Sequence, residues 1–123
     1  MYRGCYVDNS KKRLLPGFKY DLPDTNSPER CIQYCLRIGF QLAGVEYTTE
    51  CFCGNEKDIE NADIHPNSTA CQRYPCPGSD SAKCGGYNSI AVYNTGVLRK
   101  SLLYLLNNQT LKPESNQRRV LFN

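Results

Sequence analysis

The sequence predicts a small, disulfide-rich α+β domain in which one main helix is cross-linked to strands. All eight cysteines lie within residues 5–84. Cys31 and Cys35 are four residues apart in a segment of helical pattern, whereas Cys51 and Cys53 are two apart in a segment of strand pattern. Each pair separates its sulfurs by about 6 Å, at roughly 1.5 Å per helical residue and 3.3 Å per strand residue. We therefore expect two parallel disulfides between the pairs, and the spacing leaves open which sulfur bonds to which.

The even number of cysteines indicates an oxidised, exported protein. Two glycosylation acceptor triplets favour the same compartment, with Asn67 and Asn108 as the residues to be modified. The alternative is a reduced zinc protein, which typically uses CxxC pairs. The spacings here are CxxxC, CxC and CxxxxC, and His65 is the single histidine. We therefore expect four disulfides and no metal or other cofactor.

The first expected strand covers residues 2–8, which include aromatic and β-branched residues in loose alternation. A helix is predicted over residues 28–38. Ser27 is a favourable N-cap, Pro28 suits the first helical position, and Gly39 ends the helical pattern. The apolar residues of this helix share one face, which carries both cysteines: Cys31, Tyr34, Cys35 and Ile38.

Two further strands, residues 42–47 and 50–54, are predicted to form a hairpin. Residues 55–75 are polar and are expected to form an exposed excursion. Residues 76–84 are predicted to be a small loop, closed at its base if its two cysteines pair. Residues 89–93 alternate as a final strand. One face of this strand carries Ile90 and Val92, and the other carries Ala91 and Tyr93.

The composition changes after Gly96. We predict one domain over residues 2–94, followed over residues 95–123 by a linker or the start of a truncated domain, with a short helix possible at its beginning. Residues 1–96 hold ten Lys and Arg against eleven Asp and Glu, whereas residues 97–123 hold five against one. The net charge of +3 therefore belongs to the tail, and the cysteine-rich part has no basic footprint for nucleic acid. No apolar run is long enough to insert into a membrane.

No apolar run of signal-peptide length precedes the first cysteine. Because the cysteine content indicates export, we expect the chain to be a fragment of a larger secreted or membrane-anchored protein. Its expected location is extracellular or the lumen of the secretory pathway, at the cell surface or in the Golgi. A domain of roughly 95 residues has a thin core, and each disulfide can add about 2 to 5 kcal/mol to its stability.

Seven segments of the chain resemble the WSC domain, and the resemblance covers about residues 2–94. They combine the cysteines with characteristic neighbours in the same order. The matching segments are YRGCYVD at 2–8, RL at 13–14, the CxxxC at 31–35, AGVEY at 43–47, ECFCGN at 50–55, CGGYN at 84–88 and VY at 92–93.

The resemblance implies a helix packed on a twisted antiparallel sheet and a non-catalytic, carbohydrate-binding role. WSC domains occur in cell-wall stress sensors, in kringle-containing co-receptors of the Wnt pathway and in the stem of peptide O-xylosyltransferases. The expected partner is a glycan, either a polysaccharide or a glycosaminoglycan, or a neighbouring domain. The family's disulfide pattern, carried over in order, implies the pairs Cys5–Cys71, Cys31–Cys51, Cys35–Cys53 and Cys76–Cys84.

Aromatic faces and planar polar groups are the usual sugar-binding elements. Phe52 lies between Cys51 and Cys53, so strand alternation predicts that it points away from the disulfides, toward solvent or a partner. The family often has Trp at this position, and Phe is the weaker stacking surface. The candidate glycan-binding residues are Tyr47, Phe52, Tyr74 and Tyr87, with Glu46, Glu50, Asn55 and Asn88.

The alternative function is a spacer or protein-interaction stem domain of a Golgi glycosyltransferase similar to peptide O-xylosyltransferase. Glu46 would then be a buried hydrogen-bond anchor for backbone amides. A solvent-facing aromatic cluster flanked by Asn and Glu would favour sugar binding instead. Catalysis by the domain itself is not expected, because Glu46 and Glu50 flank a turn and no unpaired cysteine would remain as a nucleophile.

Overall fold

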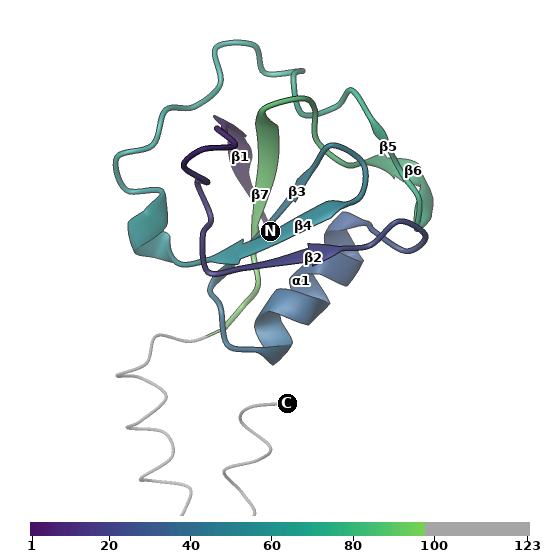
Figure 1. Ribbon diagram of the computed structural model, residues 1–123, viewed down its shortest axis with the longest axis horizontal. Helices are drawn as coiled ribbons and strands as arrows, with labels where there is room; N and C mark the ends of the chain where they lie inside the picture. The colour runs from purple at the N-terminus through teal and green to yellow at the C-terminus, as the bar shows by residue number, and fades with distance from the viewer. Residues whose placement is uncertain (98–123) are drawn as a thin grey trace, which may run out of the picture.

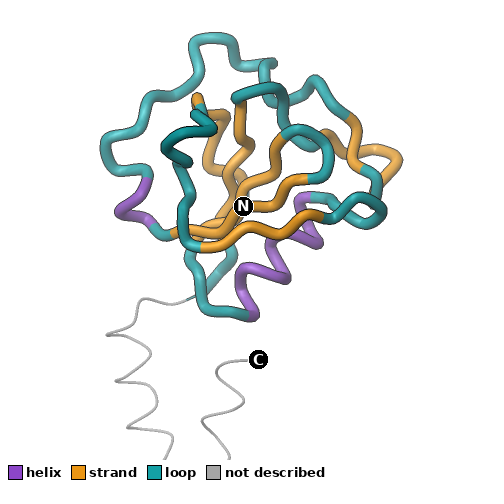
Figure 2. Tube along the Cα trace, in the orientation of Figure 1, coloured by secondary structure: helices purple, strands orange, loops and turns teal. Residues whose placement is uncertain are grey.

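The computed structural model describes residues 1–97. Its centre is a five-stranded antiparallel sheet in the order β1-β7-β3-β4-β2, with one helix across one face and a two-stranded hairpin, β5 with β6, beside it (Figures 1 and 2). This is the predicted α+β class. The elements are β1 (Tyr2–Val7), β2 (Phe18–Asp21), α1 (Pro28–Arg37), β3 (Leu42–Glu46), β4 (Glu50–Gly54), the 3₁₀ turn η1 (Glu56–Asp58), β5 (Pro75–Cys76), β6 (Ser79–Lys83) and β7 (Ser89–Asn94).

Helix α1 begins where the sequence predicts. The Ser27 side chain accepts a hydrogen bond from the backbone amide of Arg30 at 3.0 Å, which satisfies one of the free amides of the first turn. The helix ends at Arg37, and Gly39 follows with φ of +94°. Both helical cysteines are buried as predicted, but Ile38 is 44% exposed. The prediction that Ile38 continues the buried face is wrong because the helix ends just before it.

The face of the sheet toward α1 holds a core built largely of disulfides. Cys31 bonds to Cys51 and Cys35 bonds to Cys53, so that two parallel bridges join α1 to β4. The prediction from the cysteine spacing is confirmed. The other two bridges are Cys5–Cys71 and Cys76–Cys84, and the four pairs are those that the family resemblance implies.

The opposite face of the sheet carries a second core. Loops cover this face: residues 8–17, which follow β1, and residues 55–64, which follow β4. Gly44 in β3 leaves room for two side chains of this core, because a Cβ there would lie 2.5 Å from the Ile90 side chain of β7 and 3.0 Å from the Leu15 side chain of the first loop. The buried members are Tyr6, Leu15, Leu42, Phe52, Ile59, Ile90 and Val92.

Phe52 belongs to this second core and is 2% exposed. It does point away from the disulfides, but the prediction that it faces solvent or a partner is wrong. Strand alternation gives the direction of the side chain, whereas the loops that cover this face decide its environment. The Arg13 guanidinium lies 4.9 Å from the centre of its ring, and the Lys19 ammonium lies 5.6 Å from it.

Two features of the architecture were not predicted. Strand β2 is a four-residue edge strand that pairs with β4, from Phe18 opposite Cys53 to Asp21 opposite Glu50. The segment predicted as a simple loop contains the β5–β6 hairpin, closed by the Cys76–Cys84 disulfide. The short helix considered after Gly96, and Asn108, lie outside the described residues. Within residues 1–97, no helix is long and apolar enough to cross a membrane.

Candidate functional site

Three chain segments meet at the turn between β3 and β4. The amide of Thr48 donates to the Cys84 carbonyl at 3.2 Å, and the amide of Tyr74 donates to the Gly85 carbonyl at 3.1 Å. Gly85 has φ of +75°, and a Cβ there would lie 2.5 Å from the carbonyl oxygen of Val45. Only glycine fits this close approach, so the CGGYN segment is pinned against the end of β3.

A group of tyrosines, here called the tyrosine cluster, consists of Tyr47, Tyr74 and Tyr87 and lies on this frame. The ring of Tyr47 is 5.3 Å from that of Tyr74 and 6.0 Å from that of Tyr87, in edge-on arrangements at 82° and 65°. Tyr47 is 51% exposed and Tyr87 is 70% exposed, while Tyr74 is half-buried. The cluster is therefore an aromatic surface open to solvent.

Asn88 lies beside this surface in a tight turn. The amide of Gly86 donates to the carbonyl of Ser89 at 3.0 Å, so Tyr87 and Asn88 form the tip. Asn88 has φ of +51°, a conformation that asparagine tolerates better than most residues. Its carbonyl accepts a hydrogen bond from the amide of Asp8 at 2.9 Å, which fixes the turn and leaves the side chain exposed.

Two buried carboxyl groups, Asp8 and Glu46, lie next to this frame with the guanidinium of Arg13. Arg13 donates to Asp8 at 3.0 Å, and its Nη1 is 3.7 Å from Glu46 Oε2. The amide of Leu14 also donates to Asp8, at 2.8 Å. Asp8 and Glu46 are 4% and 2% exposed, so they are closed to a substrate. Glu46 is a buried anchor, but its partners are side chains rather than the predicted backbone amides.

The environment sets opposite protonation states for these two carboxyls. Burial, followed by the hydrogen bond and the charge of Asp8, raises the pKa of Glu46 to about 9. Burial alone would raise the pKa of Asp8 as well, but hydrogen bonds from Glu46, from the amides of Leu14 and Asn9 and from Arg13 hold it below its ordinary value. At neutral pH the raised pKa keeps Glu46 protonated, so its carboxyl O–H is a hydrogen-bond donor for the ionised carboxylate of Asp8.

The other predicted polar partners lie elsewhere. Glu50 forms an ion pair with Lys19 at 3.3 Å across β4 and β2. Asn55 follows Gly54, the last residue of β4, which pairs with Leu42. Leu42 lies four residues before Glu46 in β3, so Asn55 is about 13 Å from Glu46 along the strand. Its side-chain oxygen accepts from the amide of Gln41 at 3.1 Å. The structure therefore brings together Tyr47, Tyr74, Tyr87 and Asn88, and it separates Phe52 and Asn55 from them.

Asn67 is exposed on the long excursion after η1, and its side-chain oxygen accepts from the Thr69 hydroxyl at 2.8 Å. This position leaves it open to a modifying enzyme. The sulfurs of Cys31, Cys35 and Cys51 lie within 4.8 Å of one another, a spacing that could suggest a metal site. All three are bonded in disulfides, so none of them is a thiolate ligand.

The chain matches the WSC domain over residues 2–86. It is 39% identical over 95 residues to Xylosyltransferase sqv-6 of Caenorhabditis briggsae, an alignment that covers 77% of this chain and 12% of that protein. Xylosyltransferase oxt of Drosophila melanogaster is 34% identical over 96 residues, with 78% and 11% covered. Kremen protein 2 of Homo sapiens is 37% identical over 100 residues, with 78% and 20% covered.

The chain thus spans between about a tenth and a fifth of the length of these relatives. The fold and the four disulfides agree with the match, which extends over well over half of the chain. The chain therefore belongs to the WSC domain family.

Proposed function

We propose that this WSC domain is a non-catalytic glycan-binding module of a larger secreted or membrane-anchored protein, and that the tyrosine cluster with Asn88 contacts the sugar. The observation that carries the proposal is the exposed tyrosine cluster beside an exposed Asn. An exposed aromatic cluster flanked by Asn and Glu is the arrangement expected for sugar binding. The aromatic residues and the Asn are present, whereas Glu46 is buried and Glu50 pairs with Lys19. Glu46, which the sequence suggested as a sugar ligand, is buried at the end of β3, one residue before Tyr47, and does not contact the sugar in this proposal.

The chemistry of the cluster suits a polysaccharide or a glycosaminoglycan. Tyrosine rings present electron-rich faces to the C–H groups of a pyranose, and their hydroxyls and the Asn88 amide can exchange hydrogen bonds with sugar hydroxyls. The backbone hydrogen bonds of Thr48 and Tyr74 hold the three segments in place before binding. A preformed surface loses less conformational entropy when it binds, which favours affinity.

The disulfides support the proposed location. Four bridges among eight cysteines are typical of proteins that fold in the secretory pathway. This chemistry supports extracellular or Golgi residence, and the exposure of Asn67 supports its modification there.

The second candidate is a spacer or interaction domain in the stem of a xylosyltransferase-like enzyme. The similarity to the two xylosyltransferases favours it, because the chain matches only 11–12% of each of them. A stem domain would contact neighbouring protein rather than sugar, and its aromatic surface would be covered by that protein.

The test is retention of the purified 123-residue chain on an array of β-glucans and glycosaminoglycans. Tyr47→Ala and Tyr87→Ala should each weaken retention about threefold to tenfold, the equivalent of roughly 0.5 to 1.5 kcal/mol for one aromatic contact. The matched control is Phe18→Ala, because Phe18 is 49% exposed on β2 and lies outside the cluster. Its retention should equal that of the unmodified chain.

Circular dichroism and titration of free thiols in denatured, unreduced protein would show that each variant is folded and oxidised. Unchanged retention of both tyrosine variants would reject the proposed site. Absence of retention by the unmodified chain on every glycan would favour the spacer role.

A further inference from the structure

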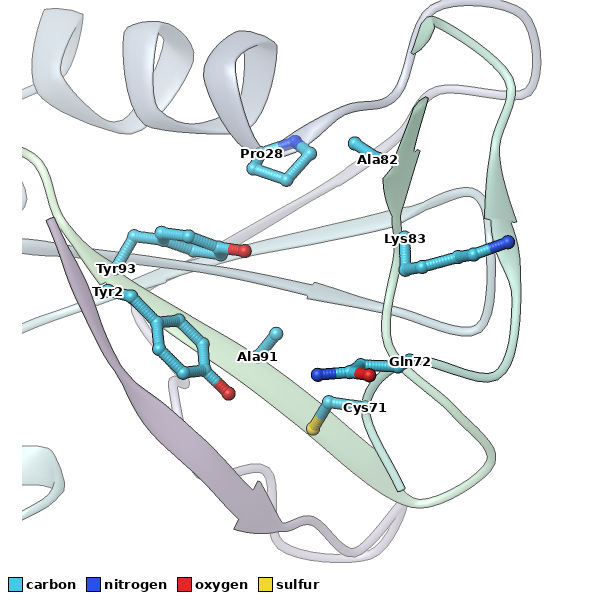
Figure 3. Close-up of a pocket in the computed structure, with 8 residues that line it drawn as sticks. All are labelled: Tyr2, Pro28, Cys71, Gln72, Ala82, Lys83, Ala91 and Tyr93. Atoms are coloured by element: carbon cyan, nitrogen blue, oxygen red, sulfur yellow. The ribbon is translucent and has the colours of Figure 1, made fainter. Parts of the chain in front are cut away.

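A cleft of ≈ 340 Å³ lies between β7, the start of β1 and the β5–β6 hairpin, and none of its lining residues belongs to the tyrosine cluster. Figure 3 shows the rings of Tyr2 and Tyr93 on one side, Gln72 and Lys83 on the other, and Ala91 between them. Its size falls at the lower end of the range of about 300–1,000 Å³ for small-ligand sites.

The aromatic wall comes from two paired strands. Tyr2 in β1 lies opposite Tyr93 in β7, with ring centres 5.2 Å apart and the ring planes at 56°. Tyr2 is 51% exposed and Tyr93 is half-buried. Burial raises the pKa of both hydroxyls above 10, so both keep their protons at neutral pH and can donate hydrogen bonds.

The polar wall is held by disulfides. Gln72 is next to Cys71, whose disulfide joins this segment to β1, and it forms a backbone bridge with the CGGYN segment. Lys83 is next to Cys84, whose disulfide closes the β5–β6 hairpin. Both polar side chains therefore project from anchored backbone, and the two walls are in place before any ligand binds.

The charge of the cleft favours an anionic ligand. Its lining holds one cation, Lys83, and no carboxylate, and Lys83 forms no ion pair with any other residue in 1–97. The remaining lining residues are small or apolar: Pro28, Cys71, Ala82 and Ala91. A ligand that fits must present a flat apolar face to the tyrosines and a negative group to the ammonium.

We propose that this cleft binds an acidic sugar, a pyranose that carries a carboxylate. Its C–H face lies against Tyr2 and Tyr93, its carboxylate meets the Lys83 ammonium, and the Gln72 amide binds a ring hydroxyl. The inference is independent of the proposed role of the tyrosine cluster, because the two sites share no residue.

A second cleft gives the competing location for an anion. Its lining holds three cations, Lys12, Arg13 and Lys57, together with the carboxylate of Asp58, and no aromatic residue. Arg13 is already bonded to Asp8. This cleft offers positive charge without a stacking surface. It would therefore bind a simple carboxylate such as acetate as tightly as it binds an acidic sugar.

The experiment is an NMR titration of the ¹⁵N-labelled 123-residue chain with methyl β-glucuronide, methyl β-glucoside and acetate. Glucuronide should shift the amides around Gln72 and Lys83 and should bind more tightly than either other probe. Lys83→Gln should weaken glucuronide binding about fivefold, the most that a solvent-exposed ion pair usually contributes, and should leave glucoside binding unchanged. Tyr2→Ala should weaken both sugars.

The matched control is Lys12→Gln, which makes the same change of charge in the second cleft. It should leave glucuronide binding unchanged. Loss of binding in Lys12→Gln but not in Lys83→Gln would overturn the proposal, and so would equal affinity for glucuronide and glucoside. Failure of the tyrosine-cluster variants to change retention on glycan arrays would leave this result untouched.

Discussion

Glu46 keeps its proton at neutral pH because burial and the neighbouring Asp8 raise its pKa to about 9. In the unfolded chain its pKa is the ordinary 4.5. Between these two values the unfolded chain releases a proton that the folded chain retains. The contribution of Glu46 to stability is therefore complete below pH 4.5 and is lost as the pH rises toward 9. Asp8, whose pKa is lowered, contributes in the opposite sense and loses its contribution as the pH falls.

Glu46→Gln should remove this pH dependence. A glutamine amide can donate to Asp8 as the protonated carboxyl does, but it does not titrate. We expect the variant to match the unmodified chain near pH 5 and to be more stable at pH 8. The difference should grow by at most about 1.4 kcal/mol per pH unit. Urea unfolding at several pH values measures it, with exposed Glu60→Gln as the control. If the free energy of unfolding of Glu46→Gln and of the unmodified chain changed with pH in the same way, Glu46 would not be the protonated partner of Asp8.

At the scale of the element, β4 shows what alternation can and cannot predict. The CxC spacing correctly gives two inward cysteines and an intervening Phe52 on the other face. It does not reveal that Leu15 and Ile59, from loops on either side of the strand in sequence, bury that other face. Phe52 is therefore a core residue, and its ring contacts the cations of Arg13 and Lys19 rather than a ligand.

Phe52→Ala should consequently lower stability rather than remove a binding contact. Truncation of a buried phenylalanine typically costs about 3 to 5 kcal/mol. Phe18→Ala, on the exposed edge strand β2, should cost less than about 1 kcal/mol. Urea unfolding of the two variants measures the difference. A stable Phe52→Ala protein that had lost glycan retention would instead return Phe52 to the binding site.

The sequence correctly predicted the elements that depend on interactions between residues close together in the chain. Ser27 caps α1 through an amide three residues away, and Ile90 and Val92 separate from Ala91 by simple alternation. The elements that were missed depend on distant pairing. β2 is a strand because it pairs with β4, about thirty residues later. Its four residues, Phe-Lys-Tyr-Asp, alternate aromatic and charged side chains, but so short a run does not predict a strand by itself. The tyrosine cluster likewise joins three separate segments, so its members could be named from the sequence but their meeting could not be foreseen.

At the scale of the molecule, stability rests on disulfides that close loops of different length. Cys5–Cys71 spans 66 residues, whereas Cys76–Cys84 spans 8. Loop-closure entropy assigns about 4.4 kcal/mol to the long loop and about 2.5 kcal/mol to the short one. The long bridge also attaches the excursion, and with it Gln72, to the first strand of the sheet.

Paired replacement by alanine tests this ranking. Removal of Cys5 and Cys71 should destabilise the domain by about 2 kcal/mol more than removal of Cys76 and Cys84. The comparison is matched because all four cysteines are buried to a similar degree, at 5% exposure or less. Urea unfolding under oxidising conditions measures both variants. Equal losses of stability would show that native packing, rather than loop closure, determines what each bridge contributes.

The N-terminus and the end of the last strand lie side by side, since the amide of Asn94 donates to the carbonyl of Met1 at 2.8 Å. Tension applied through Met1 and through the residues after Asn94 would therefore peel β1 from β7 one hydrogen bond at a time, the weakest geometry for a strand pair. At Cys5 the covalent bridge to Cys71 takes up the load, so the chain between these two cysteines carries none of it. In a protein that carries this domain in tandem with others, α1, β3 and β4 would thus be protected from strain, because all three lie between Cys5 and Cys71, whereas β7 would bear it.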